Sequence, residues 1–485
     1  MRARVTALLP AMVVPPALAG LLLLIFRGDG FPNYDTEYAL VWGRAIADGV
    51  APDTSAFLSP TPHPLVNVVG AFLALVDPVS GAAPHGTASE SLVTAGAFLW
   101  LGVLGFLVFR LGQQWLGLGA GLVAAALVLT REPILSFGVR AYVDIPFVCL
   151  VLGALLRESR QPRDGVGVLT LLALAGLIRP EAWLFAGAYL IYLWWPRRWA
   201  TPRLAALVAL AAAGPALWAL HDLLITGDPL YSLTGTRENA DVLRRATGFD
   251  DLPITGSRRL GEITREPVLL GAVLGLALAW LRLRDRHAVR AGLAALVVAG
   301  GAFALLAGAG LPIITRYLLL EAVLLALLAA TALTAFTQLA PGDRLRRPAY
   351  AAALAVATAL VAFGPGQLDR IDRLRDSITI QTAILTDLRD LTRQPGAVPC
   401  GPLAVPNQRP VPQLALWLDL APSKIVVTQR QGAPARGTYA KPATPQAARR
   451  FVLDPRDANL AIPDPAPGSA RRAANASWVT FARCG

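Results

Sequence analysis

The stretch Phe31-Pro-Asn-Tyr-Asp-Thr-Glu-Tyr38 is polar and closely follows an apolar segment, residues 5–26. It carries two carboxylates, Asp35 and Glu37, where the chain is predicted to leave a membrane. Apolar residues then recur with helical spacing until Gly49, so we expect a short amphipathic helix along the membrane surface. The carboxylates precede or open this helix. Asp35 therefore has a second interpretation, as the cap of the helix N-terminus.

The composition of the whole chain is that of a polytopic α-helical membrane protein. Of its 485 residues, 55% are hydrophobic and only 16% are charged, whereas a soluble domain carries roughly a quarter charged residues. The N-terminal segment has no convincing cleavage site, so we expect a retained first span rather than a signal peptide. About eleven transmembrane helices are expected, near residues 5–26, 90–109, 118–134, 144–157, 166–178, 180–195, 203–225, 267–281, 290–309, 314–337 and 348–364.

The net charge of +12 comes mainly from arginines in the short loops between apolar segments. This placement signals membrane topology rather than nucleic-acid binding. The loops that face the same side as the N-terminus all contain arginine, so we expect a multi-pass protein of the plasma (inner) membrane. Its N-terminus would be cytoplasmic and its C-terminal domain extracytoplasmic. Arginine use in place of lysine, together with many alanines, indicates a bacterial genome rich in G and C.

This topology gathers eight polar residues on the outer face. Polar groups at membrane depth cost a few kcal/mol each, so they are usually paired or functional. Each also has a structural alternative: Asp144 can cap a helix, His63 can be a simple interfacial histidine, and the arginines can extend to the interface. The eight residues are Asp35, Glu37, His63, Arg140, Asp144, Arg179, Glu181 and Arg316.

The segment 366–485 has a different composition and is predicted to form a small extracytoplasmic α/β domain. We expect a helix of about 25 residues at its start, short strands at 399–405, 424–428 and 477–483, and a helix at 412–420. Cys400 and Cys484 flank the first and last strands, which favours a disulfide in an oxidising compartment. The predicted domains are therefore 1–365, a transmembrane module with a first outer loop at 27–62, and 366–485.

Several kinds of chemistry lack a pattern in this sequence. It has no glycine-rich phosphate loop before a helix, no Cys/His cluster with metal spacing and only four histidines. The residues indicate no particular cofactor, and a requirement for a divalent metal is left as an alternative. The positive pattern is a pair of carboxylates with arginines at a membrane surface. Sugar transfer from a phosphate-activated donor suits this equipment, because phosphate leaves readily and the acceptor hydroxyl needs one general base.

An ordered set of short motifs over residues 1–340 resembles the multi-span glycosyltransferases of the GT-C class, which include protein O-mannosyltransferases and the bacterial lipid A aminoarabinose transferase. The motifs are Tyr34-Asp-Thr-Glu-Tyr-Ala-Leu with Ala-Asp-Gly49, His63-Pro-Leu65, Val143-Asp-Ile-Pro146, Leu177-Ile-Arg-Pro-Glu-Ala-Trp183 and Thr315-Arg-Tyr-Leu-Leu319. The resemblance implies that the protein works in a lipid bilayer on a polyprenyl-phosphate sugar donor. It also implies an inverting transfer, with an acidic residue of the first outer loop as the base.

The resemblance also assigns roles to particular residues. By position the base is Asp35, with Glu37 as the second candidate. Asp144 would support the acceptor or the base, and Arg179 and Arg316 would contact the donor phosphate. The C-terminal domain departs from the members of the class, so its role is not implied.

Two other functions fit parts of the pattern. A transporter or flippase for a lipid-linked saccharide would also need an apolar bundle, but transporters often show internal repeats and mid-membrane polar sites. The sequence shows no repeat, and its polar residues lie at one membrane edge. A structural membrane protein that presents the C-terminal domain is the third hypothesis.

Overall fold

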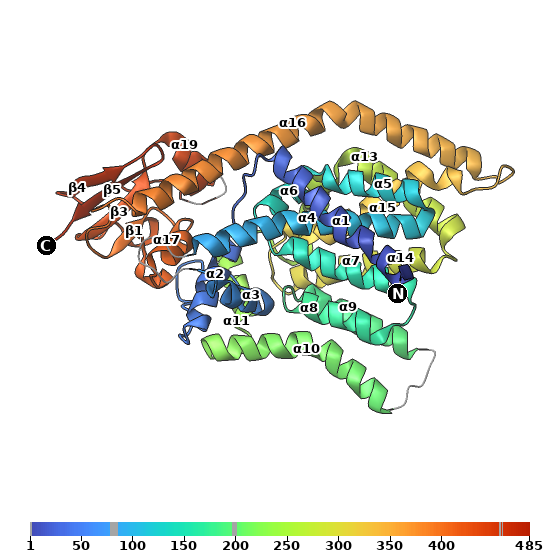
Figure 1. Cartoon of the computed structure of the whole chain (residues 1–485), viewed down its shortest axis with the longest axis horizontal. Coiled ribbons are helices and arrows are strands. Elements are labelled where there is room, and N and C mark those ends of the chain that lie inside the picture. The colour runs from blue at the N-terminus through green and yellow to red at the C-terminus, as the bar shows by residue number, and fades with distance from the viewer. Residues whose placement is uncertain (1, 78–85, 196–200, 455–456, 458) are drawn as a thin grey trace. The chain divides into compact units, whose positions relative to one another are not determined.

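The structure is a computed structural model that describes residues 2–77, 86–195, 201–454, 457 and 459–485 (Figure 1). The chain forms two compact units, each built from separate stretches of sequence. The first, which we call the helical unit, comprises Met1–Ile25, Gly96–His221 and Arg244–Leu374. The second, the mixed unit, comprises Phe26–Ala95, Asp222–Leu243 and Arg375–Gly485. Each is described on its own.

The helical unit consists of helices that pack through small residues. A Cβ on Gly275 of α13 would collide with the Leu328 carbonyl of α15, so the glycine permits a close approach of the two backbones. Its helices, some of which extend beyond the unit, are α1 (Arg2–Ile25), α4 (Thr87–Leu116), α5 (Leu118–Leu129), α6 (Glu132–Val139), α7 (Asp144–Arg160), α8 (Gly165–Gly176), α9 (Glu181–Trp194), α10 (Thr201–Thr226), α12 (Gly248–Asp251), α13 (Ser257–Leu278), α14 (His287–Gly308), α15 (Leu319–Thr334) and α16 (Arg346–Thr392).

By length and composition, six helices in the described residues can cross a membrane, or up to seven if α5 and α6, bent by 67°, form one span. The count of eleven expected from the sequence is therefore not confirmed. The difference lies partly in α8 and α9, which have 12 and 14 residues where a full span needs about 20. Short apolar helices look like spans in a sequence because hydropathy does not reveal where a helix ends.

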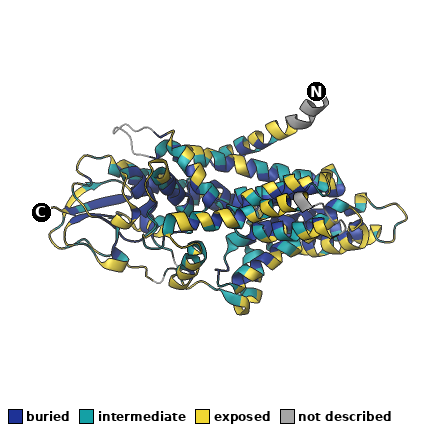
Figure 2. Ribbon diagram, turned by 90° about the horizontal axis from the view of Figure 1, so that it is seen from below, coloured by how far each residue is buried: buried dark blue, intermediate teal, exposed yellow. Residues whose placement is uncertain are grey.

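Large apolar side chains remain exposed on the long helices. Val273, Val297 and Val361 are 67%, 75% and 77% exposed, and Figure 2 shows yellow, exposed positions along the helices. A water-soluble surface rarely leaves so many large apolar residues uncovered. The helical unit thus has the surface of a membrane protein, in agreement with its apolar helices.

The mixed unit combines a five-stranded sheet with helices from three parts of the chain. The sheet has the order β2-β1-β3-β5-β4; β1 is parallel to β2 and β3, and the other pairs are antiparallel. Its elements are α2 (Tyr34–Ala47), α3 (Pro64–Ala74), α11 (Tyr231–Val242), β1 (Leu403–Val405), α17 (Val411–Leu418), β2 (Val426–Val427), α18 (Thr428–Gln431), β3 (Gly437–Pro442), α19 (Pro445–Ala447), β4 (Ala470–Ala474) and β5 (Trp478–Arg483).

One hydrophobic core joins the first outer loop to the C-terminal part of the chain. Tyr38 and Trp42 of α2 are 0% and 1% exposed and belong to the same core as Leu388 of α16 and Trp478 of β5. The helix that carries the two predicted carboxylates therefore packs with the C-terminal sheet rather than standing alone at a membrane surface.

The division of the chain differs from the predicted domains 1–365 and 366–485. The boundary at 365 falls inside α16, which is continuous from Arg346 to Thr392 and contains Pro365. The division into units also assigns residues 26–95 to the C-terminal part, because the core of the mixed unit needs the apolar face of α2. Cys400 and Cys484 form a disulfide in this unit, with Cα atoms 5.9 Å apart.

Candidate active site

Asn33 sets the position of Asp35 at the start of α2. The Asn33 side chain accepts a hydrogen bond from the Asp35 backbone amide, at 2.8 Å, and donates one to the hydroxyl of Thr36, at 2.9 Å. Asn33 is therefore the N-cap, and Asp35 lies within the first turn rather than capping the helix. The positive end of the helix dipole favours the ionised carboxylate of Asp35 at this position.

Asp35 and Glu37 occupy different environments on α2. Asp35 is half-buried, whereas Glu37 is only 1% exposed. Neither oxygen of Glu37 accepts a hydrogen bond from a donor in the described part of the chain. Burial, and then the charge of Glu90, raise the pKa of Glu37 well above its usual range. Burial disfavours the ionised form that a base needs, so Asp35 is a better candidate for the base than Glu37.

The partner of Glu37 is a residue that sequence reasoning missed. Glu90 lies at the start of α4, and its carboxylate accepts a hydrogen bond from the Trp417 indole at 2.8 Å. The negative charge of Glu90 disfavours the ionised form of Glu37, so the two acids are neighbours in the fold. They are far apart in the sequence, and no local motif connects them.

The substitution Glu37→Gln tests this assignment through pH. The unfolded chain releases the Glu37 proton near pH 4.5, while the folded chain retains it, so stability falls as pH rises above that value. We expect Glu37→Gln to make the unfolding free energy decrease less as the pH rises above about 5, and to change turnover by no more than about threefold. Chemical denaturation followed by tryptophan fluorescence measures the first effect. A steeper pH dependence in the variant would contradict the assignment.

His63 lies at the N-terminal end of α3, beside Pro64, in an extended conformation and without a side-chain cap bond. Helix α3 packs tightly on α2. A Cβ on Gly43 would collide with the backbone of Gly70, so only glycine allows the two helices to come this close. The mixed unit therefore holds Asp35, Glu37 and His63 on one pair of closely packed helices.

The helical unit brings three other predicted residues into one ion cluster. Arg179 forms ion pairs with Asp144, the first residue of α7, and with Glu181, the first residue of α9. Its Nε atom lies 3.0 Å from Glu181 Oε1, and all three residues are at least 93% buried. Two carboxylates thus satisfy the guanidinium that was predicted to contact a donor phosphate.

Aromatic and acidic neighbours complete this cluster. The ring of Tyr317 lies 3.9 Å from the Arg179 guanidinium carbon, a cation–π contact. Glu321 of α15 is 6% exposed and interacts with both Glu181 and Arg179. Sequence reasoning missed Glu321, although a carboxylate inside an apolar segment is itself a signal.

Arg140 and Arg316 lie around one short turn of the helical unit. Arg140 follows α6 and donates a hydrogen bond to the hydroxyl of Ser136. The guanidinium of Arg316 lies 5.5 Å from the centroid of the Tyr142 ring. Both arginines are half-buried, so their charges are partly shielded from solvent.

The eight predicted residues therefore form two sets, three in the mixed unit and five in the helical unit. Within the described residues, no group of three or more His, Cys, Asp or Glu side chains has the geometry to hold a metal ion. The predicted site residues are carboxylates, one histidine and arginines.

Comparisons with known proteins identify the fold. The chain is similar to ArnT from Cupriavidus metallidurans, in the apo state with a TM-score of 0.53 and 13% identity over 98% of both chains. The undecaprenyl phosphate-bound form gives 0.52 and 13% identity over 97% of both chains. The oligosaccharyltransferase AglB from Archaeoglobus fulgidus, in complex with an inhibitory peptide and a dolichol-phosphate, gives 0.48 and 12% identity over 89% of this chain and 70% of its own.

No family model matches the sequence, and no curated protein matches it. At these identities, the likeness to ArnT establishes the fold and no more. The chain has the GT-C fold, so the fold that the ordered motifs predicted is confirmed.

Proposed function

We propose that this chain is a membrane glycosyltransferase that transfers a hexosyl or pentosyl group from a polyprenyl-phosphate donor to a hydroxyl of an extracytoplasmic acceptor. The observation that carries the proposal is the placement of Asp35. Its carboxylate lies half-buried in the first turn of a capped helix, in a chain with the GT-C fold. An ArnT structure with this fold contains bound undecaprenyl phosphate, which supports a polyprenyl-phosphate ligand here.

The proposed reaction is a single inverting displacement. The acceptor hydroxyl oxygen attacks the anomeric carbon and forms the new glycosidic bond. The bond from that carbon to the donor phosphate oxygen breaks, and its electron pair leaves with the polyprenyl phosphate. Asp35 takes the hydroxyl proton, and an ionised carboxylate at a helix N-terminus is a suitable base for this step. The leaving phosphate needs positive charge more than it needs an acid.

The remaining site residues supply charge and position. Arg140 and Arg316 would compensate the charge of the leaving phosphate, since both are half-buried cations of the helical unit. Arg179 would act mainly through its ion pairs with Asp144 and Glu181, which fix the starts of α7 and α9. His63 would contact the substrate from the start of α3.

The proposed location follows from the arginine-rich loops and the apolar helices. The protein would span the plasma (inner) membrane, with its N-terminus in the cytoplasm. The mixed unit would then face the extracytoplasmic side, where it meets a glycan, lipid or protein acceptor.

The experiment that tests the proposal uses the full-length protein in lipid nanodiscs. It is incubated with polyprenyl phosphates that carry different hexoses or pentoses and with an envelope lipid extract, with and without added divalent metal. We expect release of free polyprenyl phosphate from one donor of the panel. Binding of donors without any release would favour transport, and no binding to any donor would leave only a structural role.

A further inference from the structure

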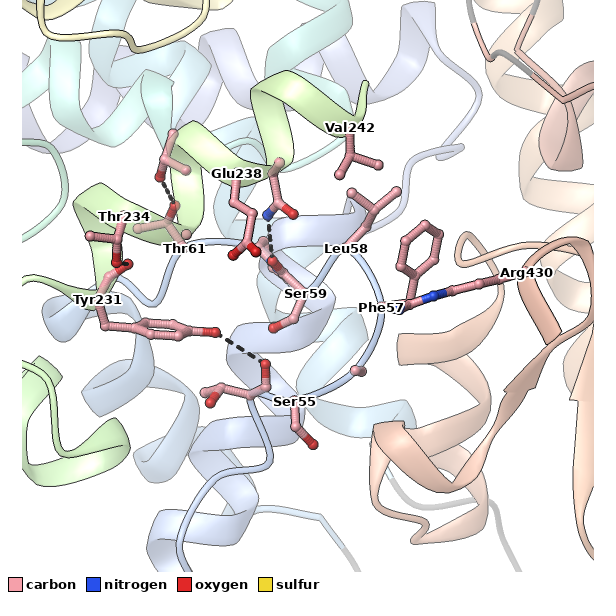
Figure 3. A pocket seen from close by; sticks show the side chains of 16 residues that line it. Ser55, Phe57, Leu58, Ser59, Thr61, Tyr231, Thr234, Glu238, Val242 and Arg430 are labelled. Atoms are coloured by element: carbon pink, nitrogen blue, oxygen red, sulfur yellow. Dashed lines mark hydrogen bonds between the residues drawn. The ribbon is translucent and has the colours of Figure 1, made fainter. Parts of the chain in front are cut away.

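A cavity of about 390 Å³ lies in the mixed unit, against a loop that is hydrogen-bonded to the helix that carries Asp35. Its walls are the loop at 54–61, one side of α11 and Arg430 of α18 (Figure 3). This volume falls within the range of small-molecule sites in proteins. The cavity therefore has room for a ligand and not only for scattered water.

Three side-chain hydrogen bonds hold the loop at 54–61, which lines this cavity. Asn239 donates from its side-chain amide to the Ser59 carbonyl, at 2.8 Å, and the Tyr231 hydroxyl donates to the Thr54 carbonyl, at 3.1 Å (Figure 3). Leu58 adopts a left-handed conformation with φ of 55°, which costs a non-glycine residue free energy. The cavity wall is thus preformed.

The third hydrogen bond connects the cavity to the candidate base. The hydroxyl of Tyr34 donates to the Leu58 carbonyl at 3.1 Å. Tyr34 is the first residue of α2 and immediately precedes Asp35. The loop that forms the cavity wall is therefore anchored at the helix turn that presents the candidate base.

The lining chemistry matches a ligand rich in hydroxyl groups. Seven of the sixteen lining residues carry a hydroxyl. Ser59 is 93% buried, and its hydroxyl has no hydrogen-bond partner in the described part of the chain. Hydroxyl groups both donate and accept hydrogen bonds, so a lining rich in them suits a ligand that itself carries several hydroxyls.

The charges of the cavity select a neutral ligand. Glu238 contributes one carboxylate and Arg430 one guanidinium, and Arg430 lies 4.6 Å from the Phe57 ring centroid. A phosphate site would need an excess of cations, and a lipid chain would need an apolar lining. A sugar presents several hydroxyls to carboxylates, hydroxyls and amides, and an apolar ring face to an aromatic side chain.

We infer that this cavity binds a neutral saccharide of the acceptor. The inference rests on the proposed transferase function, since an acceptor sugar held here would lie beside the turn that carries Asp35. Saccharide binding itself needs neither the donor nor turnover, so it can be measured separately from the reaction.

Two matched pairs of variants test the inference in the full-length protein. A Cβ on Gly235 would meet only the Tyr231 ring, at 3.9 Å, so Gly235→Leu fills the cavity while Gly235→Ala leaves most of it open. Glu238→Gln removes the carboxylate of the cavity. Asp241→Asn makes the same chemical change on an exposed part of α11 that does not line the cavity.

The readout is binding of nanodisc-embedded protein to an array of neutral and anionic oligosaccharides. We expect the wild type to bind neutral glycans, and binding by Gly235→Leu and Glu238→Gln to be about 10- to 100-fold weaker. Gly235→Ala and Asp241→Asn should bind as the wild type does. A preference for anionic glycans, no binding to any glycan, or equal binding by all variants would overturn the inference.

The donor-release assay distinguishes this result from the transferase proposal. Glycan binding that Gly235→Leu and Glu238→Gln weaken, without any donor release by the wild type, would support the saccharide site and contradict the transferase. Donor release by the wild type without glycan binding would contradict the saccharide site alone.

Discussion

The substitution Asp35→Asn is expected to lower the release of polyprenyl phosphate by at least about 100-fold, because a positioned general base contributes roughly 10²–10⁴-fold to such a step. Asparagine has nearly the same shape as aspartate but cannot take the acceptor proton. The cap of α2 should persist, since Asn33 accepts its hydrogen bond from the backbone amide of residue 35, which asparagine retains. The loss should therefore appear in turnover with little change in stability.

The control for this prediction lies at the other end of the same helix. Asp48 is the exposed C-cap residue of α2, and Asp48→Asn should keep wild-type turnover. Release of polyprenyl phosphate and thermal unfolding are measured for both variants in the same nanodiscs. Full turnover by Asp35→Asn would exclude Asp35 as the base. If turnover is lost in Glu37→Gln instead, Glu37 would be the base.

The substitution Trp478→Ala is expected to lower the unfolding free energy of the mixed unit by about 3–5 kcal/mol. Trp478 is fully buried, its indole donates to the Ile384 carbonyl at 2.9 Å, and its ring meets Phe451 edge to face, with centroids 6.2 Å apart. Because α2 shares this core, its backbone amides should lose protection together with those of the sheet. Hydrogen exchange followed by mass spectrometry measures both.

Trp280→Ala is the matched control, since Trp280 belongs to the helical unit and is 59% exposed. It should leave the exchange of the α2 amides unchanged. Faster exchange of the sheet in Trp478→Ala, with α2 still fully protected, would show that α2 is stable without the C-terminal core. In that case the carboxylate helix and the sheet would be independent elements.

The fold could be predicted in part because some of its patterns are local. The helix that begins near Asp35 and the strand that ends at Arg483 have clear periodicity and boundaries. Strands β3 and β4 were missed, since β3 begins at Gly437 and ends at Pro442, and β4 reads Ala-Arg-Arg-Ala-Ala. Such residues disfavour strands on their own, and pairing with β5 stabilises them.

Site residues could be predicted from the sequence only where the position of a single residue, without its partners in space, indicates a role. Asp35 stands out because a carboxylate follows an apolar segment and opens a helix. The acidic neighbour of Glu37 is distant in the sequence, so Glu90 could not be inferred from it. Arg179 was expected to contact phosphate, but its carboxylate partners depend on how three helices pack, and no sequence pattern reports that packing.

The proposed sugar transfer is tested most directly by measuring both products of one reaction. Full-length protein in nanodiscs receives its polyprenyl-phosphate donor with an isotope-labelled sugar, together with the acceptor extract. The labelled glycoside, its anomeric configuration by NMR and the free polyprenyl phosphate are then quantified. We expect equal amounts of the two products and an inverted anomeric carbon. Intact donor throughout, or a labelled product with retained configuration, would contradict a single displacement assisted by Asp35.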